Sequence, residues 1–498
     1  MKNITIILLL IILFFPSIKS QENNRVIIEM TLDEVIEMAQ RQSLYSFRTK
    51  NMYLSKYWEF RSYKADKLPS LVLSSTPLNY DRSVVSRYDS EDDVERFIPR
   101  SYFTSDAALS VRQNVIFTGG VFDITTSANR SQNLDTDKVD ISTVPISIGF
   151  TQSLNGYNRF RWESKIEPLK FEQAKLEYLQ SLESLSIQAT NYFFNTATAE
   201  INRRIAEVNF SNADTLYRIG KGRFEIGTVT QDELLDLELS LLNARLDVSQ
   251  SEIRLKQAHA SLNSFLGLDD DVDIVCIVPT EIPEFKINVD QALSLAIDNN
   301  PNVLDYQRQL LVARQNVART RSESGLSADI RANLGINKTA DDFTHAYNSP
   351  FSEQQQVRVG LSVPIIDWGR RKGRIQMAKS SQEVTEATVK QSLLDFEQDA
   401  IISVLDFNLQ EEQVAIAAKA DTIAQLGYEV TKQRFMIDKV DVIRLNSARN
   451  SLDAAKRNYI DSLRRFWVSY YGIRQLTLFD FEKEQNLIEN LDELLQKK

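Results

Sequence analysis

Two adjacent carboxylates, Asp232 and Glu233, are the side chains of this sequence whose types and spacing first suggest acid–base chemistry. Paired carboxylic acids can serve as general acid and general base when their surroundings separate their pKa values. This pair lies at the expected start of a long helix, where acidic side chains stabilise the positive end of the helix dipole. We therefore expect a helix-capping or gating role for the pair, no catalytic residue, and no enzyme.

The other reactive side chains do not suggest a site either. The single cysteine, Cys276, excludes an intrachain disulfide, and two histidines, His259 and His345, cannot build a His-rich metal site. We expect Cys276 to be a small buried residue, His259 to lie at the surface of a helix, and the acidic run 89–93 to be a solvated loop. The net charge of −10 argues against a nucleic-acid partner. No metal and no cofactor are expected.

The first residues have the pattern of an export signal. Lys2 precedes an apolar run over residues 4–15, and Pro16 and a polar segment follow it, with cleavage expected after Ser20. That run is too short to span a bilayer comfortably, and no later run reaches about 18 apolar residues. We expect an exported protein that has no transmembrane helix and whose mature chain begins near Gln21.

An internal repeat organises the mature chain. The segment "RFEIGTVTQDELLDLELSLLNA" (223–244) matches "RFMIDKVDVIRLNSARNSLDAA" (434–455) at an offset of 211 residues (434 minus 223). The same offset pairs Arg159 with Arg370 at two points where an alternating run passes into a long helical stretch. Because no net insertion separates these points from the matched segments, we expect two long helices of equal length.

A second match has a larger offset. "LDEVIEMAQRQS" (32–43) corresponds to "VDQALSLAIDNN" (289–300) at an offset of 257, which exceeds 211 by 46 residues. The first repeat therefore contains about 46 extra residues before 150, which fit one added strand pair or a long loop. The expected parts are a signal peptide at 1–20, a first repeat at 21–268, a linker at 269–288, a second repeat at 289–475 and a C-terminal tail at 476–498.

Each repeat reads as a helix, then strands, then a long helix hairpin. Alternating segments predict strands within about 70–155 and 327–366, and helical patterns predict hairpins at about 158–266 and 369–475. Proline is tolerated in the first turn of a helix, so Pro168 suggests that the first long helix starts close to it. From there to about Arg218 the helix would be on the order of 75 Å long. Such a helix needs neighbours along its length.

Three expected features together favour a membrane assembly: the chain is exported, its strands are long enough to cross a bilayer, and its helices are too long for one globular domain. Open strand edges are not tolerated in lipid, so membrane strands must close into a barrel. Four or six strands in one chain, the two counts that the sequence leaves open, are too few for an open channel. We therefore expect copies of the chain to pool their strands under cyclic symmetry, with the helices forming a tube beside the barrel.

The sequence resembles the TolC-like outer-membrane efflux proteins over nearly all of the mature chain. The resemblance lies in the two repeat starts, in "VPIIDWGRRKGRIQMAK" (363–379), in "RFEIGTVTQDELLDLELSLLNARL" (223–246) and in "LNSFLGL" (262–268). It implies a mainly α-helical protein with a membrane β-barrel part, built from two repeats as a trimeric channel-tunnel. The implied homotrimer has a 12-stranded barrel in outer-membrane lipid and a 12-helix tunnel in the periplasm, and it docks to a periplasmic adaptor and an inner-membrane pump.

The same resemblance assigns the helix tips to a periplasmic gate that also contacts the adaptor. The tip residues are Gly227, Thr228, Asp232 and Glu233 in the first repeat, and Asp438, Lys439, Asp441 and Arg444 in the second. We expect an ion pair between Glu233 and Lys439 to hold neighbouring hairpins together, or else these charges cap helices and face water. We also expect the added segment to lie near the barrel, with residues 79–97 as an extracellular loop.

The resulting functional prediction is an outer-membrane channel-tunnel that passes small molecules or proteins to the outside. The exported substrate stays open, as does the choice between drug efflux, metal efflux and type I secretion. The alternative is an exported coiled-coil scaffold or surface adhesin without channel activity. The matched repeat junctions and the lack of one sustained heptad seam count against that alternative.

Overall fold

The structure, a computed structural model, describes residues 26–489 except 92, 155, 270–271, 349 and 438. The expected signal peptide, residues 1–20, and the last part of the expected tail lie outside the described residues. The chain divides into two compact units. Unit 1 holds the described residues up to Lys50, Leu179–Ala296, and those from Ala400 onwards; unit 2 holds Asn51–Tyr178 and Ile297–Asp399.

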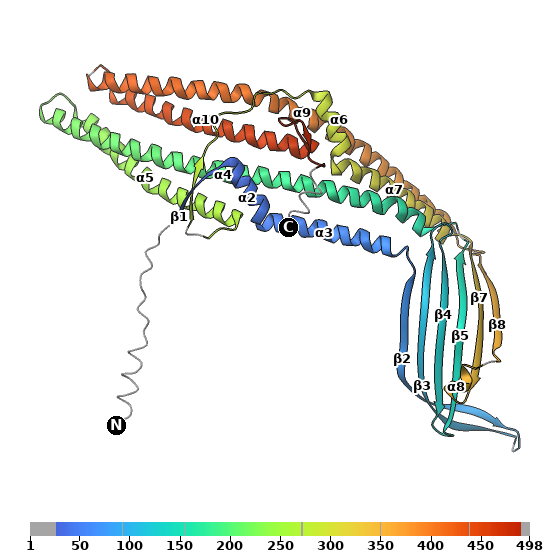
Figure 1. The fold of residues 1–498 in the computed structure, drawn as a ribbon. Helices are drawn as coiled ribbons and strands as arrows, with labels where there is room; N and C mark the ends of the chain where they lie inside the picture. The colour runs from blue at the N-terminus through green and yellow to red at the C-terminus, as the bar shows by residue number, and fades with distance from the viewer. Residues whose placement is uncertain are drawn as a thin grey trace, which may run out of the picture. The chain divides into compact units, whose positions relative to one another are not determined.

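Unit 2 contains a six-stranded antiparallel sheet in which the strands follow one another in chain order (Figure 1). Its strands are β2 (Ser70–Asp89), β3 (Val94–Val115), β4 (Gly120–Asn133), β5 (Lys138–Ser153), β7 (Ser327–Ala340) and β8 (Ser352–Ser362). A four-residue helix, α8 (Phe343–Ala346), lies in the connection between β7 and β8. Of the two strand counts that the sequence left open, six is correct.

The added residues of the first repeat form a strand pair. From its first residue, 70, to the last residue of β3, 115, the β2–β3 hairpin spans the 46 residues by which the two sequence offsets differ. The extracellular loop predicted over 79–97 is absent as a loop, because these residues continue both strands from the pair Asn79–Thr104 to the pair Asp89–Val94. Its charged and polar side chains hid the strand pattern, since both faces of this part of the hairpin are exposed.

The sheet has one apolar and one polar face. One cross-strand row joins Leu71, Val111, Ile124, Ile148 and Leu334 on successive strands and ends at Gln355 on β8. The adjacent row, one residue along each strand and therefore on the opposite face, joins Ser70, Arg112, Asp123, Gly149, Asn333 and Gln356. Large apolar side chains on the apolar face are exposed in the chain, Val357 by 75% and Leu73 by 72%.

Two long helices begin directly after the sheet, and each start is capped differently. The α4 helix (Arg159–Glu225) starts after Asn158, whose Oδ1 accepts a hydrogen bond from the backbone N–H of Arg161 at 3.2 Å. This cap starts the helix well before Pro168, which lies inside α4, so the start predicted near Pro168 was wrong. The α9 helix (Arg370–Met436) is capped by Asp367, whose carboxylate accepts from the backbone N–H groups of Gly369 and Arg371, both at 3.0 Å.

The long helices have the equal lengths predicted from the repeat. Both α4 and α9 contain 67 residues, and the helices that return from them, α5 (Gln231–Leu266) and α10 (Val442–Thr477), contain 36 residues each. In unit 1 the two hairpins pack around a core of fully buried side chains. That core includes Leu185, Phe193 and Phe194 of α4, Leu262 and Leu266 of α5, Val404 and Phe407 of α9, and Leu463 and Phe466 of α10.

The helix before the strands is broken at the matching point of both repeats. Ser43 separates α2 (Leu32–Gln42) from α3 (Leu44–Ala65), and Asn300 separates α6 (Val289–Asn299) from α7 (Pro301–Glu323). The Ser43 hydroxyl accepts from the backbone N–H of Ser46 at 3.1 Å, and Asn300 Oδ1 accepts from that of Asn302 at 3.0 Å. Each break is thus a new helix N-cap made by a residue type that favours this position.

The segment predicted as a linker includes a strand. Strand β6 (Val272–Ile277) pairs in parallel with β1 (Val26–Thr31), which precedes α2. Cys276 lies in β6 and is buried, as predicted, and burial raises the pKa of its thiol. The linker then attaches to α9 through Asn408. The Asn408 side chain accepts a hydrogen bond from the backbone N–H of Ile287 at 3.0 Å and donates one to the Ile287 carbonyl at 2.9 Å.

A buried ion-pair network holds the segment that follows α10. The Arg474 guanidinium contacts Glu183 of α4 at 3.0 Å and Asp480 of strand β9 (Phe479–Asp480) at 3.0 Å. The two carboxylate side chains are only 6% and 3% exposed. Burial raises the pKa of Glu183, and the charge of Arg474 opposes that rise. A short antiparallel pairing of β9 with β10 (Gln485–Asn486) completes the segment.

Replacing Arg474 with Met should strongly destabilise the protein, because it leaves two buried carboxylates without their cation. Breaking such a pair costs about 3–5 kcal/mol. The matched control is Arg465→Met, which removes a guanidinium that is 60% exposed and pairs with Asp461, at a cost of about 0–1 kcal/mol. Thermal unfolding of both variants checks this. Equal losses of stability would show that the buried network does not hold the segment.

Candidate functional site at the helix tips

The first helix tip is built by a helix C-cap followed at once by an N-cap. Gly227, with φ of +79°, donates its backbone N–H to Phe224 O at 3.0 Å, and Thr228 donates to Arg223 O at 2.9 Å. These two bonds form a Schellman motif, which needs a left-handed residue at the position of Gly227. Gly227 and Thr228 therefore close the end of α4.

The predicted acidic pair starts α5. The carboxylate of Glu233 accepts from the backbone N–H of Thr230 at 2.9 Å and from its hydroxyl at 3.0 Å, while the Thr230 hydroxyl accepts from the backbone N–H of Glu233 at 3.4 Å. This is a capping box. A hydrogen bond from the Thr230 side chain also lowers the pKa of Asp232. Helix capping thus accounts for both carboxylates.

The second tip repeats this construction with different residues. Lys439 donates its backbone N–H to Arg434 O at 2.9 Å, and Asp441 accepts from the backbone N–H of Arg444 at 2.8 Å. Asp441 is thus the N-cap of α10, at the repeat position that Thr230 occupies in the first tip. Asp438, which matches Gly227 in the repeat, lies outside the described residues. The side chains of Lys439 and Arg444 are exposed.

Direct contacts join the two tips within one chain. The Arg223 guanidinium donates to Met436 O at 3.4 Å, and Leu216 and Val440 pack against the apolar cluster of Tyr428, Phe435 and Leu445. Two polar contacts support these tips from farther along the helices. Asn209 donates to Asp453 at 2.8 Å, and Asn212 donates to the Tyr428 hydroxyl at 3.3 Å. The sequence did not indicate these polar contacts, because single Asn and Asp residues in a helical pattern do not show whether they are buried.

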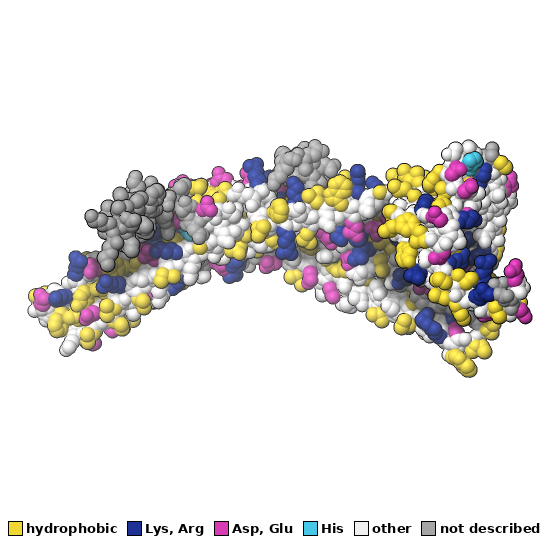
Figure 2. All heavy atoms as spheres, turned by 90° about the horizontal axis from the view of Figure 1, so that it is seen from below, with side chains coloured by type: hydrophobic (Ala, Val, Ile, Leu, Met, Phe, Trp, Pro, Cys, Tyr) yellow, Lys and Arg dark blue, Asp and Glu magenta, His cyan; other side chains and the backbone are white. Residues whose placement is uncertain are grey.

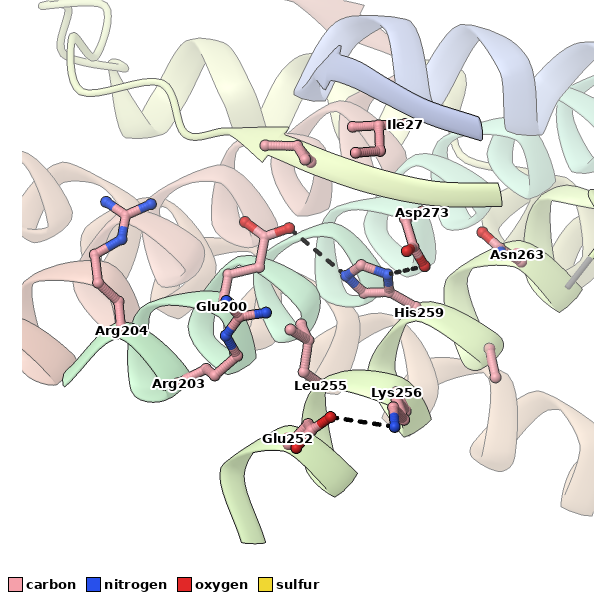
Figure 3. A pocket seen from close by; sticks show the side chains of 12 residues that line it. Ile27, Glu200, Arg203, Arg204, Glu252, Leu255, Lys256, His259, Asn263 and Asp273 are labelled. Atoms are coloured by element: carbon pink, nitrogen blue, oxygen red, sulfur yellow. Dashed lines mark hydrogen bonds and ion pairs between the residues drawn. The ribbon is translucent and has the colours of Figure 1, made fainter. Parts of the chain in front are cut away.

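A pocket of about 610 Å³ lies beside the β1–β6 pair in unit 1, and His259 lies on its wall (Figure 3). The His259 side chain is only 13% exposed, so the prediction that it lies at the surface was wrong. Its Nδ1 is 3.2 Å from Asp273 of β6, and its Nε2 is 3.7 Å from Glu200 of α4, which is ion-pair rather than hydrogen-bond distance. Neither partner is near His259 in sequence, so nothing local indicated the burial.

The surroundings of His259 favour its charged form. The carboxylate of Glu200 and then that of Asp273 raise the pKa of His259, while burial opposes them. Of the three other cationic side chains on the pocket wall, Arg203 and Lys256 are paired with Glu207 and Glu252, and the third is Arg204. His259 on α5 therefore connects the linker strand β6 to α4 through these two carboxylates, which favour its charged form.

The structure contains neither a membrane-spanning helix nor a metal-ligand cluster among the residues it describes. No helix within 26–489, apart from the gaps given above, is long and apolar enough to cross a bilayer. Within the same residues, no group of three or more His, Cys, Asp or Glu side chains is arranged to hold a metal ion.

His259→Gln should lower stability in a pH-dependent way. Because the pKa of His259 is raised in the folded state, its charged form contributes fully below the ordinary His pKa of about 6.5, and that contribution fades as the pH rises through the folded-state value. We expect a loss on the order of 1 kcal/mol at pH 5.5 and a smaller loss at pH 8.5. Thermal unfolding of both proteins across this range checks it; a difference that does not change with pH would contradict it.

Comparison with known proteins gives two relatives with assigned roles. The chain is 22% identical over 270 residues to "Toxin and drug export protein A" of Aggregatibacter actinomycetemcomitans, which covers 54% of each chain. It is also 22% identical over 321 residues, 64% of this chain and 58% of the relative, to "Pyoverdine export outer membrane protein OpmQ" of Pseudomonas putida. The chain thus spans about half the length of the curated relatives it matches.

Solved structures share the fold over most of the chain. The Campylobacter jejuni CmeC outer membrane channel superposes with a TM-score of 0.64 at 14% identity, covering 93% of this chain and 89% of that one. The open state of the Neisseria gonorrhoeae MtrE outer membrane channel gives 0.57 at 13% identity, covering 90% and 88%. The fold is therefore that of TolC-like channel-tunnels, mainly helical with a strand part.

The sequence model of the family described as "Outer membrane efflux protein" matches residues 121–268 and 292–477. These two segments begin within β4 and just after the start of α6, and they end at the ends of α5 and α10. They therefore contain both long helix hairpins and most of the sheet, together with both tips. The chain belongs to the outer membrane efflux protein family, whose members reside in the outer membrane.

Proposed function

We propose that the protein is the outer-membrane channel-tunnel of an export machine and that three copies of the chain form it. One observation carries the proposal: the sheet has an exposed apolar face, a polar face and two edge strands, β2 and β8, each of which is paired on one side only among the described residues. Open edges are not stable in hydrocarbon, whereas a closed barrel satisfies every strand. Edge β2 of one copy then pairs with edge β8 of the next.

The strand count changes the barrel that the family resemblance implied. Three copies of a six-stranded sheet supply 18 strands, not 12. Barrels of 16–18 strands leave an aqueous channel inside. The row from Arg112 to Gln356 then lines the channel, and the row from Leu71 to Leu334 faces lipid. The turn of the β2–β3 hairpin, which includes Ser90, faces the outside.

The partners and cargo belong to this proposal. A tunnel with one end in the outer membrane needs an inner-membrane pump and a periplasmic adaptor to supply it, and the helix tips are the part of the chain that would meet them. The named relatives export toxins, drugs and pyoverdine, which supports small molecules or proteins as cargo. No catalytic step is proposed, because capping accounts for the paired carboxylates at the tip. A scaffold or adhesin would not need a sheet with one apolar exposed face.

Neighbouring residues on β8 test the faces of the sheet. Val357→Arg should prevent assembly or sharply reduce the amount of folded trimer in the outer membrane, because an arginine facing lipid near the bilayer centre costs about 2–4 kcal/mol. Gln356→Arg, one residue away on the polar face, should assemble normally. The measurement is the yield of detergent-resistant trimer from outer membranes. Equal yields of the two variants would contradict the proposed orientation.

The tip residues are proposed as the resting gate, with Lys439 and Glu233 of neighbouring hairpins as the restraining pair. Exposed pairs are worth about 0–1 kcal/mol, so Lys439→Glu should raise resting conductance in a planar bilayer by up to about fivefold per pair. Glu233→Gln removes the charge but keeps a side chain that suits the capping box, and it should have the same direction of effect.

The control for this gate is Thr230→Ala. It removes the cap while leaving the Glu233 charge, so it should cost about 0.5–2 kcal/mol of stability without opening the channel. Glu233→Lys combined with Lys439→Glu should restore part of the closure, although this double variant also loses the capping box. If Lys439→Glu and Glu233→Gln both conduct like the parent, the pair does not hold the gate.

A further inference from the structure

Every segment that leaves the sheet at its helix-bearing end exposes a large apolar side chain. The α3–β2 connection exposes Leu68, the β3–β4 turn Phe117, the β5–α4 connection Leu154, the α7–β7 connection Leu326, and the β8–α9 connection Ile365 and Trp368. These six residues are called the apolar belt below. Phe117, Ile365 and Trp368 are 96%, 91% and 94% exposed. Trp368 has the apolar body and polar N–H of the aromatic side chains that collect where a membrane meets water.

Cations follow the apolar belt immediately. Arg161 and Lys165 lie in the first two turns of α4, and Arg370, Arg371, Lys372 and Arg374 lie in the first two turns of α9. All six side chains, called the basic collar below, are exposed. Within the part of the chain that the structure describes, none of the six forms an ion pair, although Lys165 lies 5.8 Å from the ring of Trp162. Figure 2, which views the sheet from the end that carries α8, shows hydrophobic side chains exposed over the region of the sheet.

The basic collar lies at helix starts, where the helix dipole disfavours cations. The first turns of a helix favour acidic side chains and disfavour cations, because the unpaired N–H groups give that end a positive field. The cap of α9 already uses the Asp367 carboxylate for the backbone N–H groups of Gly369 and Arg371. Those backbone hydrogen bonds, and then the charges of Arg371 and Arg370, lower the pKa of Asp367. One carboxylate beside four exposed cations leaves the start of α9 with a net positive charge, which an anionic surface would complement.

We infer that the basic collar binds the phosphate groups of anionic phospholipids in the leaflet that faces the helices. This inference rests on the proposed function, which puts the sheet across the outer membrane. Charge complementarity and continuity with the apolar face of the sheet support it: Val359 and Leu361 face lipid, the apolar belt follows, and the basic collar comes next along the chain. Clusters of four to eight Lys and Arg residues beside a membrane segment attract anionic headgroups in this way. Long Arg and Lys side chains can also reach such headgroups from a nearby backbone position.

The test compares phospholipids on the purified, detergent-solubilised full-length protein. Phosphatidylglycerol should raise the unfolding temperature by several degrees, and phosphatidylcholine with the same acyl chains and inorganic phosphate should do so far less. The triple variant Arg370→Gln, Lys372→Gln, Arg374→Gln should lose at least half of the phosphatidylglycerol shift. The matched control, Lys390→Gln, Lys419→Gln, Lys432→Gln, removes the same charge from the same helix outside the basic collar and should keep the shift.

A second readout does not depend on charge variants. Phosphatidylglycerol with bromine near its headgroup should quench the tryptophan fluorescence more than the matching phosphatidylcholine. Trp368→Phe should reduce that difference, and the remainder should come from Trp162, which lies beside Lys165. Equal effects of the two lipids on the wild-type protein, or equal effects of the two triple variants, would overturn the inference. An equal shift with inorganic phosphate would mean a free-anion site and would also overturn it. A triple variant that loses its assembly in lipid-free detergent, while the control keeps it, would assign these cations to a neighbouring copy instead.

Conductance separates this inference from the proposed function. If the wild-type protein conducts in planar bilayers but is stabilised equally by both lipids, the lipid inference alone is overturned. If the protein binds phosphatidylglycerol through the basic collar but never conducts, the lipid inference is supported and the proposed channel function is overturned.

Discussion

A strand with an open edge cannot remain in hydrocarbon, because its unpaired N–H and C=O groups find no water there. The rest of this molecule depends on that constraint. The six-stranded sheet leaves β2 and β8 open and exposes an apolar face, so a single chain in the outer membrane is incomplete. The polar row from Arg112 to Gln356 is equally unsuited to lipid. In the proposed trimer, neighbouring copies pair with both edges and enclose the polar face. The equal lengths of α4 and α9 then let both hairpins of each chain extend equally far from the sheet.

The two repeats meet this requirement with the same lengths but different chemistry. Helices α4 and α9 have identical lengths, yet Asn158 caps one and Asp367 caps the other. At the opposite ends, a Thr–Glu capping box in the first repeat is replaced by Asp441 in the second. Capping can be done by several residue types at little difference in free energy. The side chains at these points are therefore free to diverge, and only the first repeat carries the extra β2–β3 hairpin.

The sequence was sufficient for the parts of the fold that depend on periodicity and length. The offset of 211 predicted the equal helices, and the surplus of 46 predicted that an added strand pair was possible. It was insufficient where a single contact overrides a local signal. Asn158 starts α4 before Pro168, and the exposed faces of the β2–β3 hairpin gave residues 79–97 the composition of a loop. The burial of His259 depends on Glu200 and Asp273, which only the tertiary fold brings to it. At the tips, the sequence placed Asp232 and Glu233 at a helix start, but it did not identify Thr230 as the N-cap or the contact of Arg223 with Met436.

The parallel pairing of β1 with β6 has a consequence for the order in which the chain acquires its structure. Val26 pairs with Val272, a separation of 246 residues (272 minus 26). Contacts between residues so far apart form slowly, because a long loop must close before they contribute. When the chain is exported from its N-terminus, the first strand arrives without its partner and stays unpaired until the whole first repeat has followed. The β1–β6 pairing therefore forms only after the linker strand has been exported.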